Sequence, residues 1–183
     1  MVMRTTILAA GLLVGALTAS INARAEIKTV PYVDVAKYLG DWYQIAHIPL
    51  IFEGGQCSCA RQRLTTTSTA GVIGVFNSCN DGSASGRLRT ISGTASDDDS
   101  KSNSKFTVSF EGVPFKGSYW IIGLDSHYRF AVVSDAGGDA LYILSKTPTL
   151  ANKLYQEALA IGAQQVDISK LAITDQANCV YPK

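Results

Sequence analysis

Eight short segments, many of them rich in Val, Ile, Thr, Tyr, Phe and Trp, follow one another along this 183-residue chain. Turn-forming runs such as "TSTAG", "NDGSASG", "GVPFKG" and "DAGGD" separate them. Strands of this length and spacing within one domain are typical of an all-β sandwich or barrel. The predicted strands are 42–48, 56–66, 72–80, 87–95, 104–111, 117–125, 128–135 and 140–147.

One segment, 147–163, departs from this pattern. Its apolar residues recur at helical spacing, and Pro148 and Gly162 suit the start and the end of a helix. One face is therefore apolar, and we expect the helix to cover the outside of the sheet. A helix that binds a partner is the alternative. The apolar residues are Leu150, Leu154, Tyr155, Ala158, Leu159 and Ile161.

The N-terminus is typical of a secretory signal peptide. A positively charged "MVMR" precedes an uncharged run from Thr5 to Ile21, and "ARA" follows. The run is short and is interrupted by Gly, Thr and Ser, which argues against a membrane span. We expect cleavage after Ala25 and a single domain over 26–183. Since no cysteine lies near the cut, we expect a soluble periplasmic or secreted protein without a lipid anchor.

The charge of the mature chain excludes one class of partner. Without Arg4 and Arg24, the 16 Lys and Arg residues fall to 14, against 15 Asp and Glu. No basic stripe interleaved with aromatic residues is present, so we expect no binding to nucleic acid.

Four cysteines in an exported chain indicate disulfide bonds. If 56–66 and 72–80 form a hairpin centred on Thr69, Cys59 lies directly opposite Cys79. Directly opposed residues have Cα atoms close enough for a disulfide. We therefore predict Cys59–Cys79, which leaves Cys57–Cys179.

A metal or redox site is the alternative for "CSC", but metal-binding cysteines usually come with histidines or a second close pair. The chain has only His47 and His127, and each is expected to be a hydrogen-bonded polar residue. Asp97, Asp98 and Asp99 lack the spacing of a calcium loop, so a solvated turn is favoured. We predict no metal and no cofactor.

The same count assigns the two faces of the hairpin. Ala60, Gln62 and Leu64 share the face opposite to the cysteines and arginines, and across the hairpin they meet Phe76 and Gly74. We assign these five residues to the interior. Their mixture of polar, small and aromatic side chains favours a loosely packed interior that holds a cavity.

Several motifs resemble those of the lipocalin family, closest to the branch that holds bacterial lipocalins and apolipoprotein D. They are "YLGDWYQIAHIP", "FEGG", "GSYWIIGLDSHYRFAVVSD" and "LYILSKTPTL", in the family's order. The resemblance covers about residues 34–179. It implies an eight-stranded antiparallel up-and-down β-barrel with one helix packed outside. The closing "ITDQANC" is also similar, and the family's bridge implies Cys57–Cys179.

The resemblance gives roles to five residues. Gly40 would lie where the chain crosses the closed end of the barrel, Trp42 would plug that end, and Lys146 would pack across the indole. The family usually has Arg at this last position, and Lys lacks the planar fork of Arg. Asp125 and Tyr128 match part of the family's turn motif. All five are predicted to be structural.

The resemblance also implies a ligand cavity inside the barrel. Family positions and strand parity select Gln62, Leu64, Phe76, Phe110, Tyr119, Ile121, Tyr142 and Leu144. For each of them, plain core packing is the alternative. Val113 and Phe115 would form an apolar lip at the open end or an ordinary hairpin turn.

The function implied is non-enzymatic transport or storage of a small hydrophobic ligand, such as a fatty acid or a lysophospholipid. We expect a monomer or weak dimer with transient contact to membrane surfaces. A pigment or haem binder would use His47 as its ligand. An enzyme acting inside the barrel would need a free thiol or an inward His–carboxylate pair. A protein-binding module would need a long apolar rim.

Overall fold

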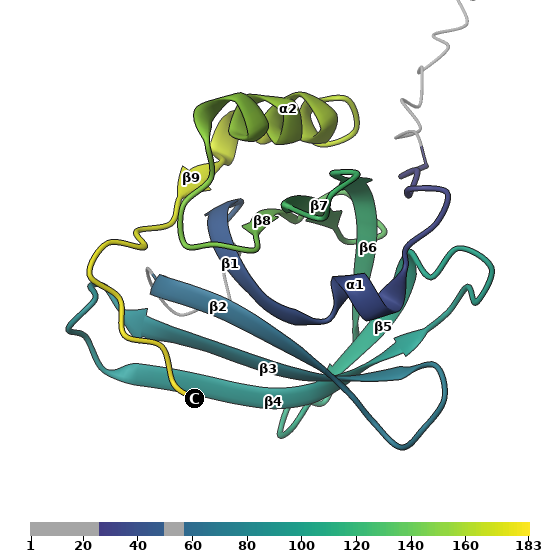
Figure 1. Ribbon diagram of the computed structural model, residues 1–183, viewed down its shortest axis with the longest axis horizontal. Coiled ribbons are helices and arrows are strands. Elements are labelled where there is room, and N and C mark those ends of the chain that lie inside the picture. The colour runs from purple at the N-terminus through teal and green to yellow at the C-terminus, as the bar shows by residue number, and fades with distance from the viewer. Residues whose placement is uncertain (1–25, 50–56) are drawn as a thin grey trace, which may run out of the picture.

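The computed structural model describes residues 26–49 and 57–183 (Figure 1). The predicted signal peptide, its cleavage after Ala25 and the "FEGG" motif lie outside these residues. No helix among the described residues is both long and apolar enough to cross a membrane.

Eight consecutive strands, a short additional strand and two α-helices make up the described part of the chain. The strands are β1 (Gly40–His47), β2 (Cys57–Thr66), β3 (Val72–Asp81), β4 (Leu88–Asp97), β5 (Lys105–Phe110), β6 (Gly117–Leu124), β7 (Phe130–Ser134), β8 (Leu141–Ser145) and β9 (Ala172–Ile173). The helices are α1 (Val35–Tyr38) and α2 (Asn152–Ala163), and a 3-10 turn covers Ile168–Lys170.

The strands form one antiparallel sheet in the order β2-β3-β4-β5-β6-β7-β8-β1-β9, and β1 also pairs with β2. This last pairing closes β1 to β8 into a barrel, which confirms the predicted fold. The short helix α1 crosses one end of the barrel, called the closed end here. The loops β3–β4, β5–β6 and β7–β8 therefore lie at the opposite, open end. The sequence did not predict α1 or β9.

Helix α2 lies against the outer face of β6, β7 and β8, as predicted (Figure 1). It begins at Asn152 rather than at 147, because the Thr147 hydroxyl donates to the carbonyl of Thr149 and stabilises a turn instead. Gly162 permits close approach to the sheet, since a Cβ there would lie 2.9 Å from a methyl group of Leu141.

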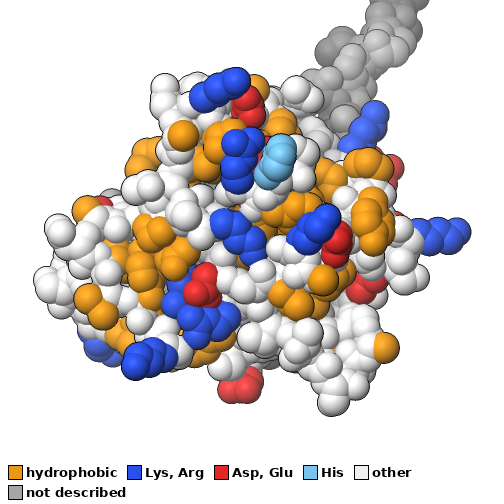
Figure 2. All heavy atoms as spheres, viewed as in Figure 1, with side chains coloured by type: hydrophobic (Ala, Val, Ile, Leu, Met, Phe, Trp, Pro, Cys, Tyr) orange, Lys and Arg blue, Asp and Glu red, His pale blue; other side chains and the backbone are white. Residues whose placement is uncertain are grey.

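Apolar side chains form one cluster inside the barrel and another between the barrel and α2. Neighbouring residues of one strand alternate between the clusters, as a pleated strand requires. In β7, for example, Val133 packs inside and Val132 packs outside. On the face shown in Figure 2, basic and acidic side chains are interspersed with apolar and neutral ones.

The predicted disulfide pairing is wrong. The structure joins Cys57 to Cys79 and Cys59 to Cys179, and the Cα atoms of each pair are 5.5 Å apart. Both the count along the hairpin and the family resemblance had exchanged the partners of Cys57 and Cys59.

A β-bulge in β2 explains the exchange. The register of β2 against β3 shifts by one at Cys59 and Ala60, so that these two residues oppose a single residue of β3. Cys59 has a left-handed φ of 57°, and its N–H donates to the carbonyl of Asp175 in the C-terminal segment, 2.8 Å away. Cys57 lies opposite Asp81 and so shares a face with Cys79, while the bulge frees Cys59 to bond with Cys179. A count along the chain assumes an unbroken ladder and misses the bulge.

The inner face of β3 also differs from the prediction. The last pair before the turn is Thr66 with Ile73, one residue later than a turn centred on Thr69 gives. A slip of one residue exchanges the two faces of a strand. Phe76 and Gly74, predicted for the interior, therefore lie on the outer face.

The C-terminal segment completes the barrel wall between β1 and β2. These strands pair with each other only towards the closed end, and further along β1 pairs with β9 instead. The Gln176 amide group donates to the carbonyls of Gln44 on β1 and Ala60 on β2, each at 2.8 Å. One side chain thus bridges the two strands where their own pairing ends.

Candidate functional site

The closed end of the barrel is plugged as predicted. Trp42 is fully buried, and its indole N–H donates to the carbonyl of Tyr38 at 2.7 Å. The Lys146 ammonium lies 4.2 Å from the centroid of the indole and donates to the carbonyls of Tyr38 and Leu39. Gly40 has a φ of +94°, which favours glycine where the chain enters β1.

The electrostatics of this plug depend on burial. Burial lowers the pKa of Lys146 to about 8, and the nearby Asp41 carboxylate opposes that shift. Hydrogen bonds from Arg63 in turn lower the pKa of Asp41. The plug is therefore a cluster of structural contacts at the closed end of the barrel.

Asp125 and Tyr128 also have structural contacts. The Asp125 carboxylate accepts two hydrogen bonds of 2.8 Å from the Arg129 guanidinium and two from the backbone N–H groups of His127 and Arg129. These hydrogen bonds, those from Arg129 first, hold its pKa well below the ordinary range. The Tyr128 hydroxyl accepts from the backbone N–H of Asp34, which ties this turn to the start of α1.

The closed half of the barrel interior is almost filled by side chains. A cavity of about 10 Å³ remains there, roughly enough for one water molecule. Three of the predicted ligand-binding residues, Gln62, Leu64 and Tyr119, line it. The others that line it are Tyr38, Ile73, Val75, Ala95, Phe106 and Val108.

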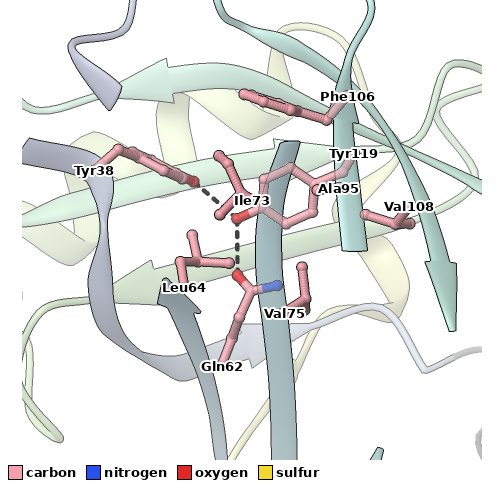
Figure 3. Close-up of a pocket in the computed structure, with 9 residues that line it drawn as sticks. All are labelled: Tyr38, Gln62, Leu64, Ile73, Val75, Ala95, Phe106, Val108 and Tyr119. Atoms are coloured by element: carbon pink, nitrogen blue, oxygen red, sulfur yellow. Dashed lines mark hydrogen bonds between the residues drawn. The ribbon is translucent and has the colours of Figure 1, made fainter. Parts of the chain in front are cut away.

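A chain of hydrogen bonds crosses this apolar cavity (Figure 3). The hydroxyl groups of Tyr38 and Tyr119 are 2.8 Å apart, and the Tyr119 hydroxyl donates to the side-chain carbonyl of Gln62 at 3.0 Å. Burial raises the pKa of both phenols, so both remain protonated donors at neutral pH. Sequence reasoning missed Tyr38, although it directly precedes the Leu-Gly-Asp-Trp motif.

The remaining predicted ligand residues do not line this cavity. Ile121 and Leu144 are buried in the interior cluster, and Phe110 and Tyr142 are partly buried against it. Phe76 belongs to neither apolar cluster. Because Phe76 lies on the outer face of β3, the structure removes it from the predicted ligand set, and the other seven residues stay a prediction.

Phe115 and the two histidines, His47 and His127, lie where simple polar and surface roles are expected. Phe115 in the β5–β6 loop is exposed, with 61% of its surface accessible. The His47 ring is stacked 6.4 Å from that of Tyr142, and its Nδ1 lies 3.3 Å from the Thr174 hydroxyl. His127 lies in the β6–β7 turn at the closed end.

Catalytic and metal-binding groups do not gather in the described part of the chain. All four cysteines form disulfides, which leaves no free thiol there. No group of three or more His, Cys, Asp or Glu residues within 26–49 and 57–183 could hold a metal ion. The Asp99 carboxylate accepts instead from the Ser102 hydroxyl and the Lys101 N–H.

Comparison with known proteins agrees with this architecture. A family model described as a lipocalin-like domain matches residues 33–176. The outer membrane lipoprotein Blc of Escherichia coli K12 is 34% identical over 153 residues, which cover 82% of this chain and 83% of Blc. Apolipoprotein D of Mus musculus is 32% identical over 154 residues, which cover 80% of this chain and 78% of the relative.

Solved structures show the same fold at lower identity. Insecticyanin of the tobacco hornworm Manduca sexta has a TM-score of 0.68 and 20% identity, with 87% of this chain and 90% of that chain covered. Lobster apocrustacyanin A1 has a TM-score of 0.65 and 16% identity, with 79% and 81% covered.

Proposed function

Because this chain belongs to the lipocalin family, whose members are known for binding small hydrophobic ligands, we propose that it carries a fatty acid, a lysophospholipid or a similar amphiphile in its barrel. Homologues in the family are generally non-enzymatic binding proteins.

One observation carries the proposal: two aromatic side chains of the interior cluster, Phe110 and Tyr142, lie nearer the open end and are only partly buried. The closed half keeps only about 10 Å³ of free space, which is too little for an amphiphile. The ligand therefore lies in the open half, against these aromatic rings. The Tyr38–Tyr119–Gln62 chain forms the floor below it.

Burial of the acyl chain supplies the affinity in this proposal. Each methylene group moved from water into an apolar cavity gains about 0.8 kcal/mol, which is about fourfold in affinity. The polar head stays in water at the open end. Affinity then rises with chain length until the open half is full.

The disulfides and the relatives both concern the compartment in which the protein acts. Two disulfides fit an oxidising compartment, and we propose that the protein acts outside the cytoplasm. Blc is named an outer membrane lipoprotein, so the relatives lend no support to the prediction that this chain lacks a lipid anchor.

The test uses the purified, oxidised protein. Mass spectrometry of an organic-solvent extract is expected to find a fatty acid or phospholipid. After delipidation, a fluorescent fatty acid is expected to bind saturably, and unlabelled fatty acids to displace it with affinity that rises with length. Phe110→Asp should weaken binding at least tenfold, whereas Leu88→Asp, an exposed site on the outer face of β4, should not.

An empty extract without saturable binding would overturn the proposal. A chromophore that absorbs visible light and co-purifies with the protein would favour a pigment carrier instead. Equal weakening by Phe110→Asp and Leu88→Asp would show that the lipid binds outside the barrel.

A further inference from the structure

A second pocket, of about 240 Å³, opens at the closed end of the barrel. It lies between α1, the turn that begins β3, the end of β4 and the start of β5. Four apolar side chains, two polar ones and Gly71 line it. The apolar residues are Val35, Val72, Ile73 and Phe106, and the polar ones are Asp97 and Asn103.

This pocket stands directly behind the barrel interior. Ile73 and Phe106 line both the small internal cavity and the closed-end pocket, and both are almost fully buried. The floor of the pocket is therefore part of the rigid core. A molecule bound there would be separated from the barrel interior by these two side chains.

The polar groups of the pocket offer hydrogen-bond acceptors. Asp97 lies directly opposite Phe106 in the β4–β5 ladder, and one of its carboxylate oxygens accepts from the backbone N–H of Asp99. No Lys or Arg of the described ranges forms an ion pair with Asp97. The side-chain NH₂ of Asn103 is used on the carbonyl of Val33, which leaves its oxygen as an acceptor.

We propose that the closed-end pocket binds a small organic amine, with its ammonium group beside Asp97 and its apolar body against Phe106 and Ile73. An anion would be repelled by Asp97 and its acidic neighbours. A wholly apolar ligand would desolvate the carboxylate without giving it a partner. In an organic amine, the ammonium group pairs with the carboxylate while the apolar body packs against the apolar lining.

The size of the pocket limits the ligand. A cavity of about 150 Å³ accommodates benzene, so 240 Å³ has room for about ten non-hydrogen atoms. A long acyl chain does not fit this space. The site is therefore independent of the lipid carried in the barrel.

Titration of the ¹⁵N-labelled, oxidised protein with 2-phenylethylamine tests the proposal by NMR. Saturable shifts are expected at the amides of Val72, Asp97 and Asn103. The neutral 2-phenylethanol should bind more weakly, and 3-phenylpropionate should not bind. Asp97→Asn should weaken binding of the amine at least tenfold and leave that of the alcohol nearly unchanged.

Asp98→Asn is the matched control, because this neighbouring carboxylate accepts from the Thr107 hydroxyl and does not line the pocket. It should bind the amine like the natural protein. Val35→Trp fills the pocket without changing its charge and should abolish binding of both the amine and the alcohol. The spectrum of each variant reports its fold.

Three results would overturn the proposal: no saturable shift, shifts confined to interior residues such as Ile121 and Val133, or equal weakening by Asp97→Asn and Asp98→Asn. Fatty acid binding measured on the same variants keeps the two sites apart. A variant that loses amine binding but keeps lipid binding has damaged only the closed-end pocket. A variant that loses lipid binding but keeps amine binding has damaged only the site in the barrel.

Discussion

The Lys146 ammonium lies 4.2 Å from the centroid of the Trp42 ring while it donates to two carbonyl oxygens at the end of α1. One cation therefore holds both the indole and the chain that crosses the closed end. Lys146→Met keeps the apolar stem but removes these contacts. We expect it to lower the free energy of unfolding by about 2 kcal/mol in urea titrations.

Lys146→Arg is the matched variant. Its planar guanidinium can stack on the indole and donate to the same carbonyls, so it should equal or exceed the natural protein in stability. A Lys146→Met variant as stable as the natural protein would show that Trp42 is held by packing alone.

The ion pair of Asp125 with Arg129 makes the free energy of unfolding depend on pH in the acidic range. Because the folded protein holds the pKa of Asp125 well below the value of about 4 found in unfolded chains, its contribution is complete above pH 4. That contribution is lost as pH falls below about 4 and the carboxylate is protonated. Stability should therefore fall more steeply between pH 4 and pH 2 in the natural protein than in Asp125→Asn. Parallel curves in urea titrations would contradict this.

The hydrogen-bond chain in the barrel should be cooperative. Tyr119→Phe leaves the Tyr38 hydroxyl and the Gln62 carbonyl without this partner inside an apolar cavity. We expect the free energy of unfolding to fall by about 1–3 kcal/mol. The double variant with Gln62→Leu should lose less than the sum of the losses in the two single variants. Tyr32→Phe, at an exposed position, is the control and should be neutral. Strictly additive losses in thermal or urea unfolding would show that the three side chains act separately.

The sequence predicts the features of this fold that depend on local pattern or on a motif. The eight barrel strands follow from alternation and turns, and the contact of Trp42 with Lys146 follows from the family motif. The bulge at Cys59 does not, because a non-glycine residue with positive φ has no signature in the sequence. Tyr38 was missed for a related reason: its role depends on Tyr119, 81 residues away.

The C-terminal segment yields the last prediction. Its backbone and the Gln176 side chain fill the gap between β1 and β2, and the Cys59–Cys179 disulfide holds it there. Removing this bond should let the segment detach while the rest of the barrel stays folded. By loop entropy the bond contributes nearly 5 kcal/mol at most, and Cys57–Cys79 about 3 kcal/mol.

Hydrogen exchange distinguishes the two bonds. In a Cys59→Ala, Cys179→Ala variant, the amides of residue 59 and Thr174 should lose protection, because they donate to partners across the gap, Asp175 and Ile45. In the matched Cys57→Ala, Cys79→Ala variant these amides should stay protected, since the segment is still tied. If these amides were equally protected in both variants, hydrogen bonds alone would hold the segment in the wall. The disulfide would then act only by lowering the conformational entropy of the unfolded chain.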